Sequence, residues 1–219
     1  MRKVLVLLLA ILMVFVLVAC QPDPEDSEDS SALPVSKEES KQALIDQGSS
    51  SGKAINVDHS GFNLQITSKY NSETSIIAIG GKNDIFWIGV KEGEEEMEYT
   101  FAKETDGKAA LYVAGVWIPL EISLKEELFS TYETLLYGAH EAQEYLQKGA
   151  DEPYNGRTCA TYSATIPMAD KSTTSVKFYV DKEWGVTLGI DYAEKSESYS
   201  LSITPVFSNP ELPSGYPAS

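Results

Sequence analysis

Residues 123–149 read SLKEELFSTYETLLYGAHEAQEYLQKG, and they form the one segment whose periodicity is clearly helical. Ser123 and Glu126 have the spacing of a capping box, in which two side chains satisfy backbone N–H groups of the first turn. Apolar side chains then recur three and four residues apart, at Leu124, Leu128, Tyr132, Leu135, Leu136, Ala139 and Leu146. Lys148 and Gly149 are typical of a helix end. The pattern predicts one amphipathic helix over residues 124–148, about 37 Å long.

The chain around this helix, residues 53–207, alternates between apolar and polar side chains, which is typical of antiparallel strands with one buried face. The clearest alternation covers residues 62–66, 97–101, 186–192 and 199–203. Glycine and aspartate mark turns between these runs. Further strands are predicted near residues 54–58, 74–80, 84–90, 109–120, 157–166 and 175–181, which gives about ten strands in total.

One helix is too small to cover such a sheet. Ten strands at about 4.8 Å spacing are about 50 Å wide, whereas a helix is about 10 Å in diameter. The sheet must therefore curl round the helix, or fold back as a sandwich or barrel. We expect a mainly β (α+β) fold, a curved antiparallel sheet of about ten strands (a half-barrel) packed on one long amphipathic helix. That arrangement would leave an apolar concavity.

The segments that flank the domain are poor in apolar residues. Residues 21–31 read QPDPEDSEDSS, with five acidic residues and no bulky apolar one, so they cannot bury enough surface to become ordered. Residues 35–47 predict only a weak helical turn, and residues 48–52 are rich in serine and glycine. We therefore predict an acidic disordered tether over residues 20–52 and an irregular proline-rich tail over residues 208–219.

The N-terminus has the layout of a secretory signal peptide over residues 1–19, with Arg2 and Lys3 before an apolar run. The run of residues 4–18 is shorter than the roughly 20 residues of a spanning helix, although an uncleaved signal anchor is the alternative. Leu17-Val18-Ala19-Cys20 resembles the lipobox of bacterial lipoproteins. The resemblance implies cleavage before Cys20, a diacylglycerol on its thiol, and a protein held on the extracytoplasmic side of the cell membrane.

The mature chain would be strongly acidic. Loss of residues 1–19 removes two basic residues and no acidic one, which leaves 15 basic and 33 acidic residues, a net charge of −18. No basic stripe is available for phosphates, so nucleic acid is not an expected partner. Electrostatic attraction to anionic lipids is not expected either. The predicted partner is the membrane, reached through the lipid on Cys20.

Signatures of catalysis, metal binding and cofactors are missing from the sequence. His59 and His140 are the only histidines, and neither has a partner at metal-ligand spacing. The acidic run at residues 92–98 is interpreted as a solvated hairpin end in preference to a Ca²⁺ site. Cys159 is the only cysteine besides Cys20, and a buried small side chain is preferred to a reactive thiol there. We expect no enzyme activity, cofactor or metal.

Aromatic side chains are the remaining candidates for binding. Trp87 lies in a strand that is apolar on both faces, and Trp117 lies just before the helix; core packing is the alternative for both. Trp184 at a hairpin tip is the candidate for a partner surface. The candidate ligand-binding residues are Trp87, Tyr99, Tyr112, Trp117 and Phe178.

A family resemblance joins these features. The strand meander from Phe62 to Leu120, the single helix, and the run KFYVDKEWGVTL at residues 177–188 are similar to the LolA/LppX-type lipoprotein carriers. That resemblance implies a curved half-barrel that encloses a helix and a lipid-binding cavity. We therefore expect a lipid-like ligand, or a peptide, on the concave face. The alternatives are a protein-interaction or sensory module of the cell envelope and, third, an enzyme acting on wall polymer.

Overall fold

The computed structural model describes residues 33–50, 61–70, 73–105, 108–120, 123–167, 173–194, 197–205 and Leu212. Several predictions fall outside these ranges and are not tested by the structure. They are the signal peptide, the lipidated Cys20, the tether up to residue 32, the strand near residues 54–58, and the tail apart from Leu212.

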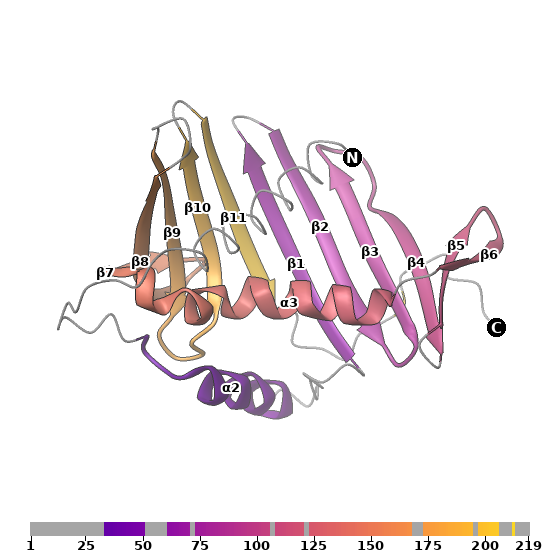
Figure 1. Ribbon diagram of the computed structural model, residues 1–219, viewed down its shortest axis with the longest axis horizontal. Coiled ribbons are helices and arrows are strands. Elements are labelled where there is room, and N and C mark those ends of the chain that lie inside the picture. The colour runs from indigo at the N-terminus through magenta and orange to yellow at the C-terminus, as the bar shows by residue number, and fades with distance from the viewer. Residues whose placement is uncertain are drawn as a thin grey trace.

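Within these ranges, eleven strands form one antiparallel sheet, so the expected mainly β fold class is confirmed (Figure 1). The strands are β1 (Gly61–Tyr70), β2 (Glu73–Lys82), β3 (Ile85–Glu92), β4 (Glu98–Thr105), β5 (Lys108–Val113), β6 (Val116–Leu120), β7 (Gln147–Tyr154), β8 (Arg157–Pro167), β9 (Thr173–Asp181), β10 (Thr187–Glu194) and β11 (Glu197–Pro205). Their spatial order is β6-β5-β4-β3-β2-β1-β11-β10-β9-β8-β7.

The sheet consists of two meanders joined at its centre. Strands β1 to β6 form one meander and β7 to β11 form the other, and each strand pairs with its neighbour in sequence. The two halves meet where β1 pairs with β11, from Leu64 opposite Pro205 to Tyr70 opposite Tyr199. This pairing turns two separate hairpin series into one continuous sheet.

Helix α3 (Leu124–Glu141) lies across one face of the sheet (Figure 1). In the chain it connects β6, one edge strand, to β7, the other edge strand. Its 18 residues span only about 27 Å, whereas eleven strands occupy about 48 Å across a flat sheet. The sheet is curved around the helix, as the sequence predicted.

The hydrophobic core lies between α3 and the face of the sheet that it covers, which we call the helix face. Phe62 of β1 packs against Phe129 and Tyr132 of α3, with ring centroids 5.6 and 5.3 Å apart. Phe62, Leu64 and Ile66 alternate along β1 and are all buried on this face. We call the opposite side of the sheet the outer face.

The first turn of α3 is capped partly by a residue from the sheet. Ser123 Oγ accepts a hydrogen bond from the Glu126 N–H at 3.4 Å, as the capping-box spacing predicted. Ser123 Oγ also donates to the carboxylate of Glu104 at 2.8 Å, and the Lys125 N–H donates to the same carboxylate at 2.9 Å. Glu104 of β4 thus supplies negative charge at the helix N-terminus, where the helix dipole favours it.

The helix ends earlier than predicted, at Glu141 instead of residue 148. A short 3₁₀ turn, η1 (Gln143–Tyr145), follows, and β7 begins at Gln147. Leu146 is buried, as its place in the apolar pattern predicted, but its backbone is extended. Residues 147 and 148 pair with β8, and this pairing takes them out of the helix.

The predicted strand at residues 109–120 is in fact two strands. Ala114 and Gly115 have φ angles of 48° and 89°, and they form the tight turn between β5 and β6. A two-residue turn with both φ angles positive matches the twist of an antiparallel hairpin. The apolar run continues through this turn without a polar residue, which is why alternation alone did not separate the strands.

The disordered tether predicted over residues 20–52 is wrong over its second half. Residues Lys37–Ser50 form helix α2. Ser36 Oγ accepts from the Glu39 N–H, and the Ser36 N–H donates back to the Glu39 carboxylate at 2.9 Å. This capping box stabilises the helix start, and its Ser-x-x-Glu spacing was visible in the sequence. Within the described ranges, no helix is both long enough and apolar enough to cross a bilayer.

Substitution of Gly80 by alanine tests the packing of the outer face. A Cβ at this position would lie 2.3 Å from Cζ2 of Trp87 on the neighbouring strand. Such overpacking costs about 1–3 kcal/mol, so we expect Gly80→Ala to lower the free energy of unfolding by this amount in urea denaturation. In a double-mutant cycle with Trp87→Ala, the cost should largely disappear. An equal cost in both backgrounds would contradict the contact.

Candidate functional site

The predicted ligand-binding residues lie on two different faces of the sheet. Trp87, Phe101, Tyr112 and Trp117 are direct cross-strand partners on β3, β4, β5 and β6. They share the outer face with Gly80, which lies opposite Trp87 on β2. Tyr99 lies two residues before Phe101 and therefore shares that face. The predicted set does not converge on a single site.

Some of these aromatic side chains are part of the packed interior. We call the set the outer aromatic row; it consists of Trp87, Tyr99, Phe101, Tyr112 and Trp117. Trp87 and Phe101 are buried, whereas Tyr112 is half-buried. Tyr99 stacks on Phe101 with ring centroids 6.1 Å apart, and Tyr112 packs against Trp117 at 5.1 Å. Phe101 was not among the predicted residues, although its position two residues after Tyr99 identifies it. The row becomes more exposed toward the β6 edge.

Phe178, the fifth predicted residue, lies on the helix face instead. It is buried in the core and pairs with Tyr162 of β8 and Ile190 of β10. A fully buried position between two neighbouring strands is typical of a structural side chain. Cys159 is also buried in this core, as predicted, and burial raises the pKa of its thiol to about 11.

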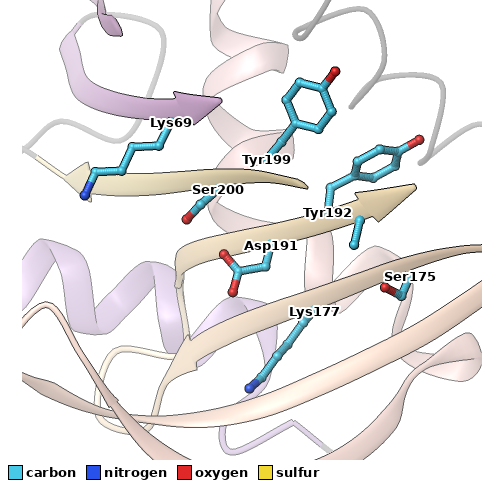
Figure 2. A pocket seen from close by; sticks show the side chains of 8 residues that line it. Lys69, Ser175, Lys177, Asp191, Tyr192, Tyr199 and Ser200 are labelled. Carbon is cyan, nitrogen blue, oxygen red and sulfur yellow. The ribbon is translucent and has the colours of Figure 1, made fainter. Parts of the chain in front are cut away.

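The helix face continues well beyond the part that α3 covers. Phe62 at the start of β1 contacts α3, while Tyr70 at the other end of β1 lies on the same face. Tyr70 stacks on Tyr199 with centroids 4.4 Å apart, and Tyr192 meets Tyr199 edge-on at 5.8 Å. Figure 2 shows Tyr192 and Tyr199 on the side of the sheet opposite to Lys69, Asp191 and Lys177. We call the three tyrosines the tyrosine rim.

Two small hydroxyl side chains lie near the rim on the helix face. Ser68 of β1 and Thr174 of β9 are both buried, and Thr174 is only 1% exposed. Thr174 Oγ1 has no hydrogen-bond partner in the described part of the chain. A buried hydroxyl without a partner is costly, and it could bind a polar group of a ligand.

A groove of about 450 Å³ lies on the outer face behind the tyrosine rim (Figure 2). Its polar side chains come from four adjacent strands: Lys69, Ser200, Asp191, Lys177 and Ser175. The groove has charges of both signs, and two of its charged groups are already paired. Lys177 Nζ lies 2.8 Å from the Glu152 carboxylate, and Tyr179 Oη donates to Asp191 at 2.8 Å. Tyr192, Ala193 and Tyr199 also line this groove, so it combines charged side chains with apolar surface.

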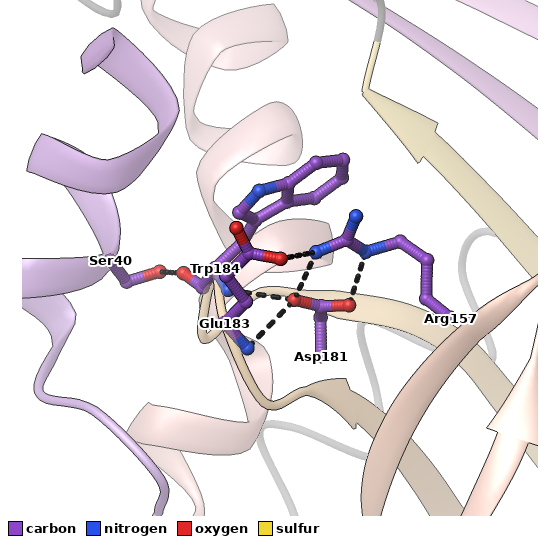
Figure 3. Close-up of polar contacts among 5 residues, drawn as sticks. All are labelled: Ser40, Arg157, Asp181, Glu183 and Trp184. Carbon is purple, nitrogen blue, oxygen red and sulfur yellow. Dashed lines mark hydrogen bonds and ion pairs between the residues drawn. The ribbon is translucent and has the colours of Figure 1, made fainter. Parts of the chain in front are cut away.

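Trp184, the predicted partner surface, lies in the β9–β10 turn, and its indole packs against the Arg157 guanidinium (Figure 3). The guanidinium carbon is 3.4 Å from the ring centroid. The Arg157 guanidinium also binds the Asp181 carboxylate through two N–H groups. Asp181 Oδ1 accepts in addition from the N–H groups of Glu183 and Trp184, at 3.0 and 2.7 Å. One buried carboxylate therefore holds the whole turn.

Helix α2 docks on this same turn. Ser40 Oγ donates to the Trp184 carbonyl oxygen at 2.6 Å (Figure 3). Gly185 has a φ of 69°, and a Cβ there would lie 1.9 Å from a methyl of Val35, so the turn and the start of α2 fit closely. Leu44 is buried on the same helix. Part of the surface predicted for an external partner is thus in contact with the chain's own α2.

Substitution of Asp181 tests how strongly this network supports the turn. The Asp181 side chain is 1% exposed, so Asp181→Asn leaves the Arg157 charge without its buried partner. Loss of one member of a buried pair costs about 3 kcal/mol or more, which should appear as a lower free energy of unfolding in urea. The matched control is Glu183→Gln, since this exposed partner of Arg157 should contribute less than about 1 kcal/mol. Equal costs would contradict the assignment.

The contact between α2 and α3 includes a histidine. His140 Nε2 lies 3.1 Å from the Val35 carbonyl oxygen, and ion pairs join Lys37 to Glu141 and Lys41 to Glu133. His140 Nδ1 and Tyr137 Oη are buried and have no hydrogen-bond partner in the described part of the chain. Burial lowers the pKa of His140. The hydrogen bond with the Val35 carbonyl opposes this in part, Lys37 lowers the pKa a little further, and Glu141 has the smallest, opposing effect.

This shift predicts a pH dependence of stability. The unfolded chain takes up the histidine proton near its ordinary pKa of about 6.5, whereas the folded chain resists protonation to lower pH. The free energy of unfolding should therefore fall as the pH decreases below about 6.5. His140→Gln should flatten the profile in urea titrations between about pH 7 and 5. Parallel profiles for the two chains would contradict the prediction.

The described residues contain no group of three or more His, Cys, Asp or Glu side chains arranged to hold a metal ion. His59 lies outside the described ranges. The features that the structure brings together are therefore an extended apolar helix face, a tyrosine rim with a buried hydroxyl, and a docked N-terminal helix.

Comparison with known proteins gives structural neighbours only. No family model matches the chain, and no curated protein is significantly similar to it in sequence. Similar solved structures include LprF from Mycobacterium bovis, with a TM-score of 0.37 and 8% identity over 79% of this chain and 94% of that one. LppX from Mycobacterium tuberculosis has a TM-score of 0.37 and 11% identity over 75% of this chain and 91% of that one.

A LolA superfamily protein from Nitrosomonas europaea is also similar, with a TM-score of 0.27 and 10% identity over 78% of this chain and 94% of that one. LppX and the LolA superfamily protein among these neighbours are of the two types that the sequence resembles. All three TM-scores are below 0.5, so the similarities carry no conclusion about function.

Proposed function

We propose that this chain is a lipid-anchored extracytoplasmic protein that binds an apolar, lipid-like ligand on the helix face of its sheet, without catalysis. The observation that carries the proposal is the extent of the helix face beyond α3. Phe62, which contacts α3, and Tyr70 are eight residues apart on one strand, or about 27 Å. A helix is only about 10–12 Å wide, which is less than half of that length, although Leu64, Ile66 and Ser68 between them are all buried.

The chemistry of the helix face beyond α3 suits a lipid. Val176, Ile190 and Leu201 are buried apolar residues on the helix face near the tyrosine rim. The rim adds three aromatic side chains at the strand ends, and Thr174 adds one buried hydroxyl for a polar head group. An apolar surface with a few polar groups at one end is typical of sites for amphipathic ligands.

The docked α2 limits how far the domain can lie from its anchor. Only residues 21–32 separate the proposed acylated Cys20 from Leu33, and they span at most about 45 Å even when fully extended. Two acyl chains hold a protein on a bilayer firmly, whereas one holds it marginally. The domain would therefore bind its ligand close to the membrane surface.

Native mass spectrometry and a lipid probe test the proposal. The chain made without residues 1–20 should retain an apolar molecule that organic solvent extracts. It should also bind a fluorescent fatty acid. Val176→Trp should weaken that binding at least about tenfold, because the indole would fill the helix face. The matched control is Ser175→Trp at the next residue, whose side chain lies in the outer groove. This control should bind normally.

A second variant guards against a folding defect in Val176→Trp. Thr174→Val keeps the side-chain shape and removes the unpaired hydroxyl, so it should fold and weaken binding of a probe with a free carboxylate more than binding of its methyl ester. A bare protein mass together with no binding of either probe would overturn the proposal and would favour the alternative of an envelope protein partner.

A further inference from the structure

The β5–β6 hairpin carries the most exposed apolar side chains in the described part of the chain. Val113 is 41% exposed, Val116 58%, Trp117 38% and Ile118 46%. The twelve residues from Ala109 to Leu120 contain no charged side chain, in a chain with a net charge of −16. Exposed apolar patches of this kind mark sites of interaction.

Both faces of the hairpin are apolar. The pairs Leu111 with Ile118 and Val113 with Val116 lie on the helix face, whereas Tyr112 and Trp117 lie on the outer face. Strand β6 is the last strand at its edge of the sheet, and Figure 1 shows the hairpin at the end of the sheet, away from α2. The hairpin thus presents aliphatic and aromatic side chains together.

The backbone of β6 is poorly suited to accept another strand. In a hairpin with a two-residue turn, Val116 and Ile118 direct their backbone groups toward β5, and Trp117 and Pro119 direct theirs outward. Pro119 has no N–H, so the outward side of β6 lacks one of its donors. Proline on an edge strand blocks strand addition, and contact must therefore come from the side chains.

We propose that this hairpin contacts the surface of the lipid bilayer, as a second attachment beside the anchor. This proposal depends on the lipid anchor at Cys20 that the proposed function includes. A link of at most about 45 Å between Cys20 and Leu33 keeps the domain near the bilayer, and the sheet is about 48 Å wide before curving. The hairpin and the anchor can therefore reach the same surface. Trp and Tyr beside aliphatic residues are typical of membrane interfaces.

The charge of the chain predicts how salt affects this contact. The acidic chain is repelled by anionic lipids, so the contact depends on apolar burial alone. Binding to anionic vesicles should become stronger as salt screens the repulsion. A contact made by basic residues would respond in the opposite way.

Vesicle co-sedimentation tests the proposal with the chain made without residues 1–20. We expect partitioning onto phosphatidylcholine vesicles, and onto vesicles with added phosphatidylglycerol at high salt. Val116→Asp should weaken partitioning at least about fivefold, because a charge enters the apolar contact. Asn83→Asp adds the same charge at the exposed turn between β2 and β3, and this control should partition normally.

Three results would overturn the proposal: no partitioning of the unmodified chain, equal partitioning of Val116→Asp, or a dimer in sedimentation equilibrium that Val116→Asp abolishes. The last result would mean that a second copy covers the hairpin. The two proposals can fail separately, because Val176→Trp should affect only the soluble fatty acid probe. Val116→Asp should affect only the vesicles.

Discussion

The architecture depends on one geometric constraint, that a single helix must connect the two opposite edges of the sheet it covers. Helix α3 starts after β6 and ends before β7, and a straight helix of its length is shorter than the flat sheet is wide. Curvature of the sheet resolves this mismatch. It also places Phe129 and Tyr132 of α3 against Phe62 at one end of the strands and leaves the other end to the tyrosine rim.

Much of this fold could be predicted from alternation and helical periodicity. Strands with one buried face, such as β1 with Phe62, Leu64 and Ile66, are recognisable because every second residue along them is apolar. Strand β7 was missed because its sequence QKGADEPY is polar and mostly exposed, so pairing with β8 alone defines it. Helix α2 was missed as a docked element because Leu44 is the only large apolar residue known to be buried among its residues 37–46. Its contacts with Trp184 and α3 are also long-range.

The candidate site was predicted less well than the fold, for a related reason. Sequence identifies aromatic residues, but the face on which each one lies follows from register. Trp87, Tyr112 and Trp117 share the outer face because direct cross-strand pairs connect them. Tyr192 and Tyr199 are partners in the β10–β11 hairpin, whereas Tyr70 meets Tyr199 only because β1 pairs with β11. That pairing joins segments at opposite ends of the domain, and no local pattern signals it.

The pairing of β1 with β11 has a consequence for how the chain reaches its native state. Of the described strands, β1 is synthesised first and its partner β11 last. The side of β1 that faces β11 therefore keeps its backbone groups unpaired until β11 has been made. Contacts this distant in sequence slow folding, and an open strand edge invites pairing with other chains. If the chain crosses a membrane N-terminus first, its N-terminal meander must be kept from aggregating until translocation is complete. The strand order thus leaves one edge of β1 open to pairing with other chains until β11 has been made.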